Sequence, residues 1–359
     1  MLLYLSVAHR TFAVPERPYR GSKLISSRGV LVSGAPFIHD SRTMAHDTWI
    51  VSLLLLPVLA LETLLTGWGT LAGALAAILA ALAADAIQSV LRHRFELDDG
   101  SAFLTGLLIA LTLPPGAPVY APIGASLFAI LAVKGAFGGL GNNWMNPALG
   151  GVAFAWLDWG SAITATVHER GIAISPPFVQ GLPSLISNFD DRLTSLFNGL
   201  IFQPLGARMP SGYFATMLGV GPGGTVGLPV GLVLAASAAL IGFRIIRWQI
   251  PAAMIAFFVG PVWLFGGVSA SGMFAGDALG LSLSGPLLLV AFFMATDPVT
   301  SPSRTLDTLI FGAGCGLIAF FFVQFGAPSF APLLGVLFMN SLTPLIEGIG
   351  TRRAKMEGA

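Results

Sequence analysis

Long apolar runs recur along this chain between residues 48 and 346, and they constrain its fold more than any other feature. The first five runs cover residues 48–66, 71–91, 102–113, 121–137 and 148–157. The second five cover residues 226–243, 250–267, 281–294, 309–325 and 330–346. A helix that crosses ~30 Å of hydrocarbon needs roughly 20 apolar residues. Because only 10% of the residues are charged and the mean hydropathy is +0.81, we predict an all-α polytopic membrane protein with about ten transmembrane helices. The net charge of +1 argues against a nucleic-acid partner.

The third run of each half is short and stops at proline, in TGLLIALTLPP and in SGPLLLVAFFMATDP. The fifth runs also resemble each other, in PALGGVAF and PLLGVLF. Since five is an odd number, the second half must enter the membrane from the opposite side. We therefore predict an inverted five-plus-five repeat with broken third and eighth helices, a pattern that points to a site near the midplane. The alternative is a chance likeness between apolar helices.

This interpretation divides the chain into five parts. They are a cytoplasmic N-terminal arm (1–46), a first five-helix repeat (47–160), an outward-facing loop (161–225), a second repeat (226–350) and a cytoplasmic tail (351–359). Cations are concentrated in the arm and the tail, at Arg10, Arg17, Arg20, Lys23, Arg28, Arg42, Arg352, Arg353 and Lys355. By the positive-inside bias, both termini are predicted to be cytoplasmic.

Charged residues inside membrane spans are functional hypotheses by default. We single out four such residues, in the predicted spans or close to their ends, namely Asp85, Lys134, Asp297 and Glu347. Asp85 and Glu347 are ion-coupling candidates, with snorkelling or local pairing as the alternative. Asp297 ends the broken eighth run, where Thr300 and Ser301 could add the oxygen ligands that hard cations prefer.

The stretch GGLGNNWMNPAL places Asn143 and Asn146 just before Pro147. If Pro147 opens a helix, Asn146 is its N-cap. The two amides could equally present donors and acceptors to a planar ring such as an isoalloxazine.

Several of these segments, in the same order, resemble the RnfD/NqrB family, over roughly residues 35–350. They are TGLLIALTLPP, KGAFGGLGNNWMNPAL, FFMATDPVTSP, LIFGAGCGL and FMNSLTPLIE. The family consists of membrane subunits of the Rnf and Nqr complexes, which are ion-translocating, flavin-dependent electron-transfer complexes in bacterial inner membranes. The resemblance implies ten helices as an inverted repeat, and partner subunits that carry flavin and iron–sulfur clusters. It also implies riboflavin near Asn143 and Asn146, and FMN joined by a phosphoester to a threonine in the outward loop.

The chain departs from the family's pattern at three points. The usual Ser-Gly-Ala-Thr flavin motif is missing, and the nearest candidates are Thr216 in PSGYFAT and Thr194 in DDRLTSL. Gly135, rather than an acid, follows Lys134, and the Gly-Arg pair that usually follows DPVTSP is absent. The first departure bears on covalent FMN and the other two bear on ion pumping.

Two functions are compatible with these features. In the first, the chain is a non-autonomous subunit of a redox-driven translocase of the NADH/ferredoxin oxidoreductase type, and it carries electrons across the membrane coupled to Na⁺ or H⁺. In the second, it is a transporter-like or accessory membrane protein without redox activity, because broken helices suit a solute path equally well.

Overall fold

The computed structural model describes residues 43–92, 97–136, 138–139, 141–169, 179, 181–205, 209–221, 227–266, 272–274, 276–283, 285–326 and 330–357. The first half contains α1 (Met44–Thr66), α2 (Trp68–Arg92), η1 (Leu97–Asp99), α3 (Ser101–Thr112), α4 (Tyr120–Phe128), η2 (Ala129–Lys134) and α5 (Pro147–Glu169). The connection between the halves, predicted as the loop 161–225, contains α6 (Leu182–Phe197), η3 (Asn198–Phe202), η4 (Gln203–Leu205) and α7 (Tyr213–Met217). The second half contains α8 (Val230–Gly242), α9 (Gln249–Phe265), α10 (Ala278–Leu283), α11 (Leu287–Leu289), η6 (Val290–Met294), α12 (Thr305–Gln324) and α13 (Ala331–Glu357). Most of the predicted N-terminal arm, residues 1–42, lies outside the described residues.

The protein is an all-α polytopic membrane protein. Among the described helices, α1, α2, α12 and the Ala331–Gly350 part of α13 are long and apolar enough to cross a membrane, and shorter apolar helices accompany them. Large apolar side chains on their outer faces are exposed, among them Leu79 (63%), Phe321 (62%) and Leu345 (61%). Surfaces of this kind suit contact with lipid rather than water. The predicted fold class is confirmed.

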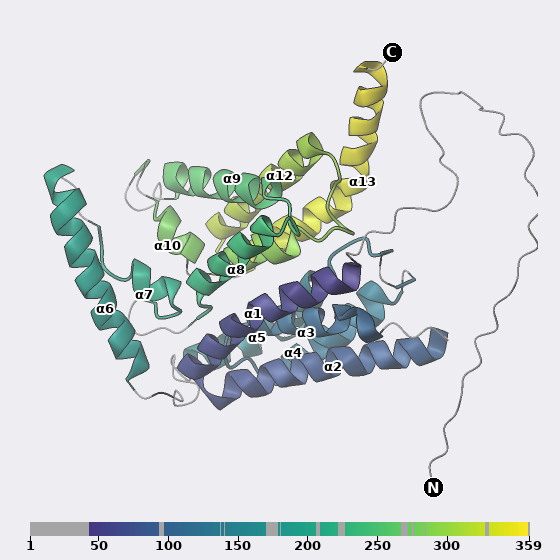
Figure 1. The fold of residues 1–359 in the computed structure, drawn as a ribbon, viewed down its shortest axis with the longest axis horizontal. Helices are drawn as coiled ribbons and strands as arrows, with labels where there is room; N and C mark the ends of the chain where they lie inside the picture. Colours follow the sequence, from purple (N-terminus) through teal and green to yellow (C-terminus); the bar gives the residue numbers. More distant parts are fainter. Residues whose placement is uncertain are drawn as a thin grey trace, which may run out of the picture. The chain divides into compact units, whose positions relative to one another are not determined.

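The two halves pack their helices in the same pattern (Figure 1). In the first half α2 contacts α4, and α4 contacts α5; in the second half α9 contacts α12, and α12 contacts α13. The α4–α5 and α12–α13 pairs both approach closely at a glycine. A Cβ atom on Gly151 would clash with the carbonyl oxygen of Ala125, and one on Gly335 would clash with that of Cys315. Small residues allow such close packing of membrane helices, and the match between the pairs fits the predicted repeat.

The third and eighth segments are both interrupted, as predicted. Helix α3 has 12 residues, which is about 18 Å of length. It ends at Thr112, and the backbone of the next residue, Leu113, is extended, because the residue before a proline disfavours helix. The eighth segment consists of α10, α11 and the π-helical turn η6, and it ends at Met294 before the Asp297-Pro298 pair.

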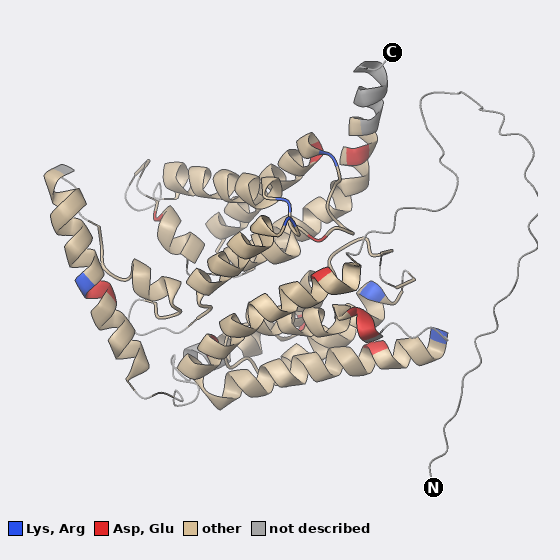
Figure 2. Ribbon diagram, viewed as in Figure 1, with Lys and Arg blue, Asp and Glu red and all other residues tan. Residues whose placement is uncertain are grey.

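Charged residues are sparse in the described helices (Figure 2). Met44, at the start of α1, lines the same cavity as Asp297. Glu347, late in α13, accepts a hydrogen bond from Ser303, in the segment that follows Asp297. The start of α1 and the later part of α13 therefore lie at the same end of the helices. Which side of the membrane this end faces stays a prediction.

Candidate functional site

The carboxylate of Asp297 closes the turn that follows the broken eighth segment. Its Oδ1 accepts a hydrogen bond from the N–H of Val299 (3.2 Å), and its Oδ2 accepts one from the hydroxyl of Thr300 (3.3 Å). The Asp297 carbonyl also accepts hydrogen bonds from the N–H groups of Thr300 (3.3 Å) and Ser301 (3.0 Å). A proline at position 298 cannot donate to the preceding helix, so the chain leaves the helix here and Asp297 is held in a fixed place.

Asn146 links the two halves of the protein through one side chain. Its Oδ1 accepts hydrogen bonds from the N–H groups of Ala148 (2.9 Å) and Leu149 (3.3 Å) at the start of α5. The predicted N-cap is therefore confirmed. On its other side, the Nδ2 donates to the carbonyl of Met294 (3.3 Å) and to Oδ2 of Asp297 (3.4 Å). The stretch GGLGNNWMNPAL and the end of the broken eighth segment, both singled out in the sequence, thus meet at this residue.

A cavity of about 250 Å³ lies beside this junction. Its polar lining residues include Asp47, Ser101, Lys134, Asn143, Asn146 and Asp297. Apolar residues from both halves supply further walls, among them Val51, Leu104 and Phe292. Asn143 is 7% exposed, and its Oδ1 is buried without a hydrogen-bond partner. An acceptor that is buried and unpaired in a largely apolar cavity suits a ligand that donates a hydrogen bond.

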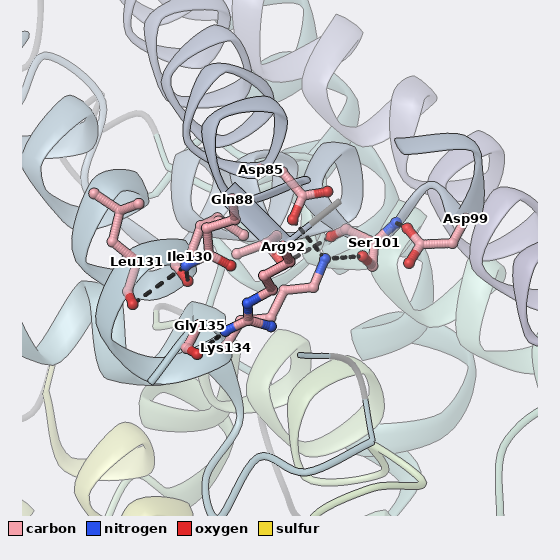
Figure 3. A network of polar contacts seen from close by, with 10 residues as sticks. Asp85, Gln88, Arg92, Asp99, Ser101, Ile130, Leu131, Lys134 and Gly135 are labelled. Atoms are coloured by element: carbon pink, nitrogen blue, oxygen red, sulfur yellow. Dashed lines mark hydrogen bonds and ion pairs between the residues drawn. The ribbon is translucent and has the colours of Figure 1, made fainter. Parts of the chain in front are cut away.

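Lys134, at the end of the π-helical turn η2, forms a buried ion pair (Figure 3). Its Nζ lies 2.8 Å from Oδ1 of Asp85 and 2.8 Å from the hydroxyl of Ser101. The side chains of Lys134 and Asp85 are 2% and 4% exposed. Pairing was the alternative to ion coupling for Asp85, and the partner is on another helix rather than nearby in the sequence. The second carboxylate oxygen, Asp85 Oδ2, is buried without a hydrogen-bond partner.

Two further side chains of α2 bind carbonyl groups of the same turn. Gln88 donates from Nε2 to the carbonyls of Ile130 (2.9 Å) and Leu131 (3.3 Å), and Arg92 donates to the carbonyl of Gly135. The N–H of Gly135 bonds to the carbonyl of Ile130 (2.8 Å), which is π-type spacing. Such a turn widens the helix locally and occurs often at functional sites. Here α2 holds it in place.

The other ion-coupling candidates lie beside the site rather than in the cavity wall. Glu347 accepts hydrogen bonds from the N–H (3.1 Å) and the hydroxyl (3.3 Å) of Ser303. Arg247 donates to the carbonyls of Pro302 and Ser303. Both charges therefore hold the segment that follows Asp297. Thr300 contacts Asp297 directly, as expected, and its own carbonyl accepts from the hydroxyl of Thr343 (3.1 Å).

The two threonines proposed for flavin attachment are both buried in the connection. Thr194 of α6 is 5% exposed and Thr216 of α7 is 9% exposed. The hydroxyl of Thr216 donates to the carbonyl of Gly212 (2.7 Å), whereas that of Thr194 has no hydrogen-bond partner. Asp190 caps α7 and accepts from the N–H groups of Gly212 (2.6 Å), Phe214 (2.8 Å) and Ala215 (3.1 Å). Neither threonine lines the cavity beside Asn146.

One buried acid was missed in the sequence. Glu62 is 1% exposed on α1, and its Oε2 has no hydrogen-bond partner. The signal was present, because Glu62 interrupts the first apolar run, in VLALETLL. Among the described residues, no group of three or more His, Cys, Asp and Glu side chains could hold a metal ion.

The comparisons with known proteins agree over most of the chain. Residues 31–355 match the model of the NQR2, RnfD, RnfE family. The D subunit of the proton-translocating ferredoxin:NAD(+) oxidoreductase complex of Clostridium ljungdahlii is 32% identical over 333 residues, which are 90% of this chain and 96% of that protein. The D subunit of the ion-translocating oxidoreductase complex of Stutzerimonas stutzeri is 34% identical, over 87% of this chain and 91% of that protein. Its counterpart of the same description from Shewanella sediminis is 31% identical, over 88% and 95%.

Proposed function

The chain belongs to the NQR2, RnfD, RnfE family, and we propose that it is a membrane subunit of an Rnf-type ion-translocating oxidoreductase complex. Its partners in this role are the other subunits of that complex in a bacterial membrane. The relatives from Clostridium ljungdahlii and Stutzerimonas stutzeri are matched over 96% and 91% of their own length. The similarity therefore extends over nearly the whole of those subunits rather than over one shared segment.

The observation that carries the proposal is the hydrogen bond between Asn146 and Asp297 beside the shared cavity. It places a carboxylate next to a space that could hold a redox group. When the charge of a bound group changes, the electrostatic potential at Asp297 changes with it, and so does the affinity of this carboxylate for a cation. Asp297 and Thr300 are the residues we propose for ion coupling.

The polar and apolar groups that line this cavity suit a flavin ring. The unpaired Oδ1 of Asn143 can accept a hydrogen bond from the ring imide, and apolar side chains such as Phe292 can cover the ring faces. The volume of about 250 Å³ is close to the lower limit of roughly 300 Å³ for small-molecule pockets. A bound flavin would accept and pass on single electrons, while Asn143 would bind it. The amide of Asn146 is already fully hydrogen-bonded, so its part is to hold the turn with Asp297 beside the cavity.

We propose that neither candidate threonine carries covalent FMN. Cations or free N–H groups stabilise a bound phosphate. At Thr216 the N–H groups that open α7 already bind the carboxylate of Asp190, which would repel a phosphate. At Thr194 the hydroxyl is buried. We therefore propose only non-covalent flavin, and no step through a phosphoester.

An absorbance spectrum before and after acid precipitation tests the proposal. We expect a yellow protein whose colour passes into the supernatant, because the flavin is not covalently bound. Asn143→Ala should lower flavin content several-fold, whereas Asn142→Ala is the matched control, since the side chain of Asn142 is exposed. A colourless wild-type protein would overturn the flavin proposal and favour a transporter-like or accessory role. Equal flavin loss in both variants would show that Asn143 has no specific part.

A further inference from the structure

Glu62 is a buried carboxyl group without a partner, far from the cavity beside Asn146. It is 1% exposed, and its Oε2 has no hydrogen bond. The hydroxyl of Thr63, the next residue, is also buried and unpaired. The nearby Thr66 hydroxyl lies 2.6 Å from both the carbonyl oxygen of Glu62 and the hydroxyl of Thr70. The hydroxyls of Thr66 and Thr70 are thus satisfied, while the Glu62 carboxyl is not.

No cation lies opposite Glu62 on the described helices that pack against α1. Helix α1 contacts α2, α3, α8 and η1. Helices α3 and α8 contain no titratable residue. The charged residues of α2, Asp85 and Arg92, stand toward its far end, and Asp98 and Asp99 of η1 stand beside Trp49 at the start of α1.

The connection also reaches this end of α1, since Leu65 packs against Ile186 and Ala215. Of its charged groups in the described part, Asp190 is already bound by three N–H groups, and Asp191 and Arg192 are exposed. Tyr213 donates its hydroxyl to Asp277 (3.0 Å). None of these groups neutralises Glu62. An isolated buried carboxylate is so unfavourable that the group takes up a proton instead.

Helix α1 also connects Glu62 to the cavity. Thr48 and Val51 line that cavity, and the hydroxyl of the buried Ser52 donates to the carbonyl of Thr48 (2.9 Å). Glu62 lies about 16 Å further along the helix than Val51. Between them, Leu55 and Val58 are 0% exposed and Leu59 is 9% exposed. An apolar barrier therefore separates the cavity with Asp297 from the carboxyl of Glu62.

We propose that Glu62 is a proton-binding site at the far side of this barrier, and that it belongs to the ion path of the complex. The role in the ion path rests on the proposed function; the binding of the proton does not. A proton, rather than a metal cation, suits the site because one carboxyl and one hydroxyl are the groups without partners there among the residues that the structure describes. Hard cations such as Ca²⁺ take about six to eight oxygen ligands.

Labelling with dicyclohexylcarbodiimide tests the proton site in membranes that contain the full chain. A protonated carboxyl adds its O–H across a C=N bond of the reagent to give an O-acylisourea, which rearranges to a stable N-acylurea without loss of any atom. At pH 8 we expect mass spectrometry to find the adduct at Glu62. Glu62→Gln should abolish this adduct, whereas Glu347→Gln should retain it, because Glu347 is hydrogen-bonded to Ser303 near the opposite end. Absence of the adduct at Glu62, with other carboxyls labelled, would overturn the proposal.

Infrared spectroscopy gives a second measurement in case the Gln variant does not insert. The wild-type chain should show the carbonyl stretch of a protonated carboxyl at pH 8, and Glu62→Asp should keep it at a shifted frequency. If the wild-type spectrum lacks this band, Glu62 is ionised and the proposal is wrong.

Proton transport by the assembled complex tests the role in the ion path. Glu62→Gln should lower proton transport at least tenfold while flavin content stays unchanged. Normal transport in this variant would overturn the role in the ion path and leave the proposed function intact. If instead the wild-type protein is colourless but Glu62 is labelled, the flavin proposal fails and the proton site stands.

Discussion

Asp85 and Asp297 are two acids at the same end of the helices, but their surroundings differ. Asp85 faces the ammonium group of Lys134 at 2.8 Å in a site that is almost closed to solvent. In the described part of the chain, the hydrogen bonds to Asp297 come from neutral donors, on Val299, Thr300 and Asn146, and Asp297 borders the cavity. The first carboxylate already has a cationic partner, whereas the second has none among the described residues and borders a cavity from which a mobile cation or a proton could reach it. Burial alone therefore does not identify a coupling residue; the sign and mobility of its partner do.

Breaking the ion pair should have the largest effect on stability. Lys134→Met leaves the carboxylate of Asp85 buried without a counter-charge, and we expect a loss of about 3–5 kcal/mol. Thermal unfolding in detergent measures it. The double variant with Asp85→Leu should recover most of the loss, because an apolar pair can replace a buried ion pair. If the single and double variants unfold alike, the charge of Asp85 is not compensated by Lys134.

Removing the link between the halves should have an intermediate effect. Asn146→Ala loses the cap of α5 and the two hydrogen bonds that Nδ2 donates to Met294 and Asp297. We expect the free energy of unfolding to fall by about 1–2 kcal/mol. Asn146→Asp keeps a capping oxygen but places a second carboxylate beside Asp297. It should retain the cap yet alter cation dependence of turnover in the complex. Identical behaviour of the two variants would mean that the contact with Asp297 does not matter.

Neutralising Asp297 should have the smallest effect on stability and a clear effect on coupling. Asn can still accept the hydrogen bond from the N–H of Val299, and its Nδ2 can donate to the hydroxyl of Thr300, but the bond from Asn146 is lost. We therefore expect Asp297→Asn to cost about 1 kcal/mol. Flavin content should not change, while cation-dependent turnover should fall about tenfold or more, corresponding to ~1.4 kcal/mol. Asp85→Asn is the matched variant, and it should lower stability rather than cation dependence. The opposite result would assign the coupling role to Asp85.

Much of this arrangement could be predicted from the sequence because prolines and polar residues in apolar runs are local signals. Pro114 and Pro298 mark where α3 and the eighth segment end, and Pro147 marks Asn146 as a cap. The partners could not be predicted, since Asp85 and Lys134 are 49 residues apart and Asn146 and Asp297 are 151 apart. Nor does any residue pattern distinguish the π-helical turn at η2 from an ordinary helix. Glu62 was visible in the sequence, but its lack of a counter-charge depends on which helices surround it.

The π-helical turn Ala129–Lys134 has a consequence for the length of the chain at this point. A π-helical turn holds one residue more than an α-helical turn, so deleting a single residue between Ala129 and Val133 would return the segment to α-helical spacing and leave the ammonium group of Lys134 on the side of Asp85. In a regular α-helix, the same deletion would turn every later side chain by about 100°. Variants of this chain should therefore tolerate the loss of one residue in this turn better than the loss of one residue in a regular part of α2.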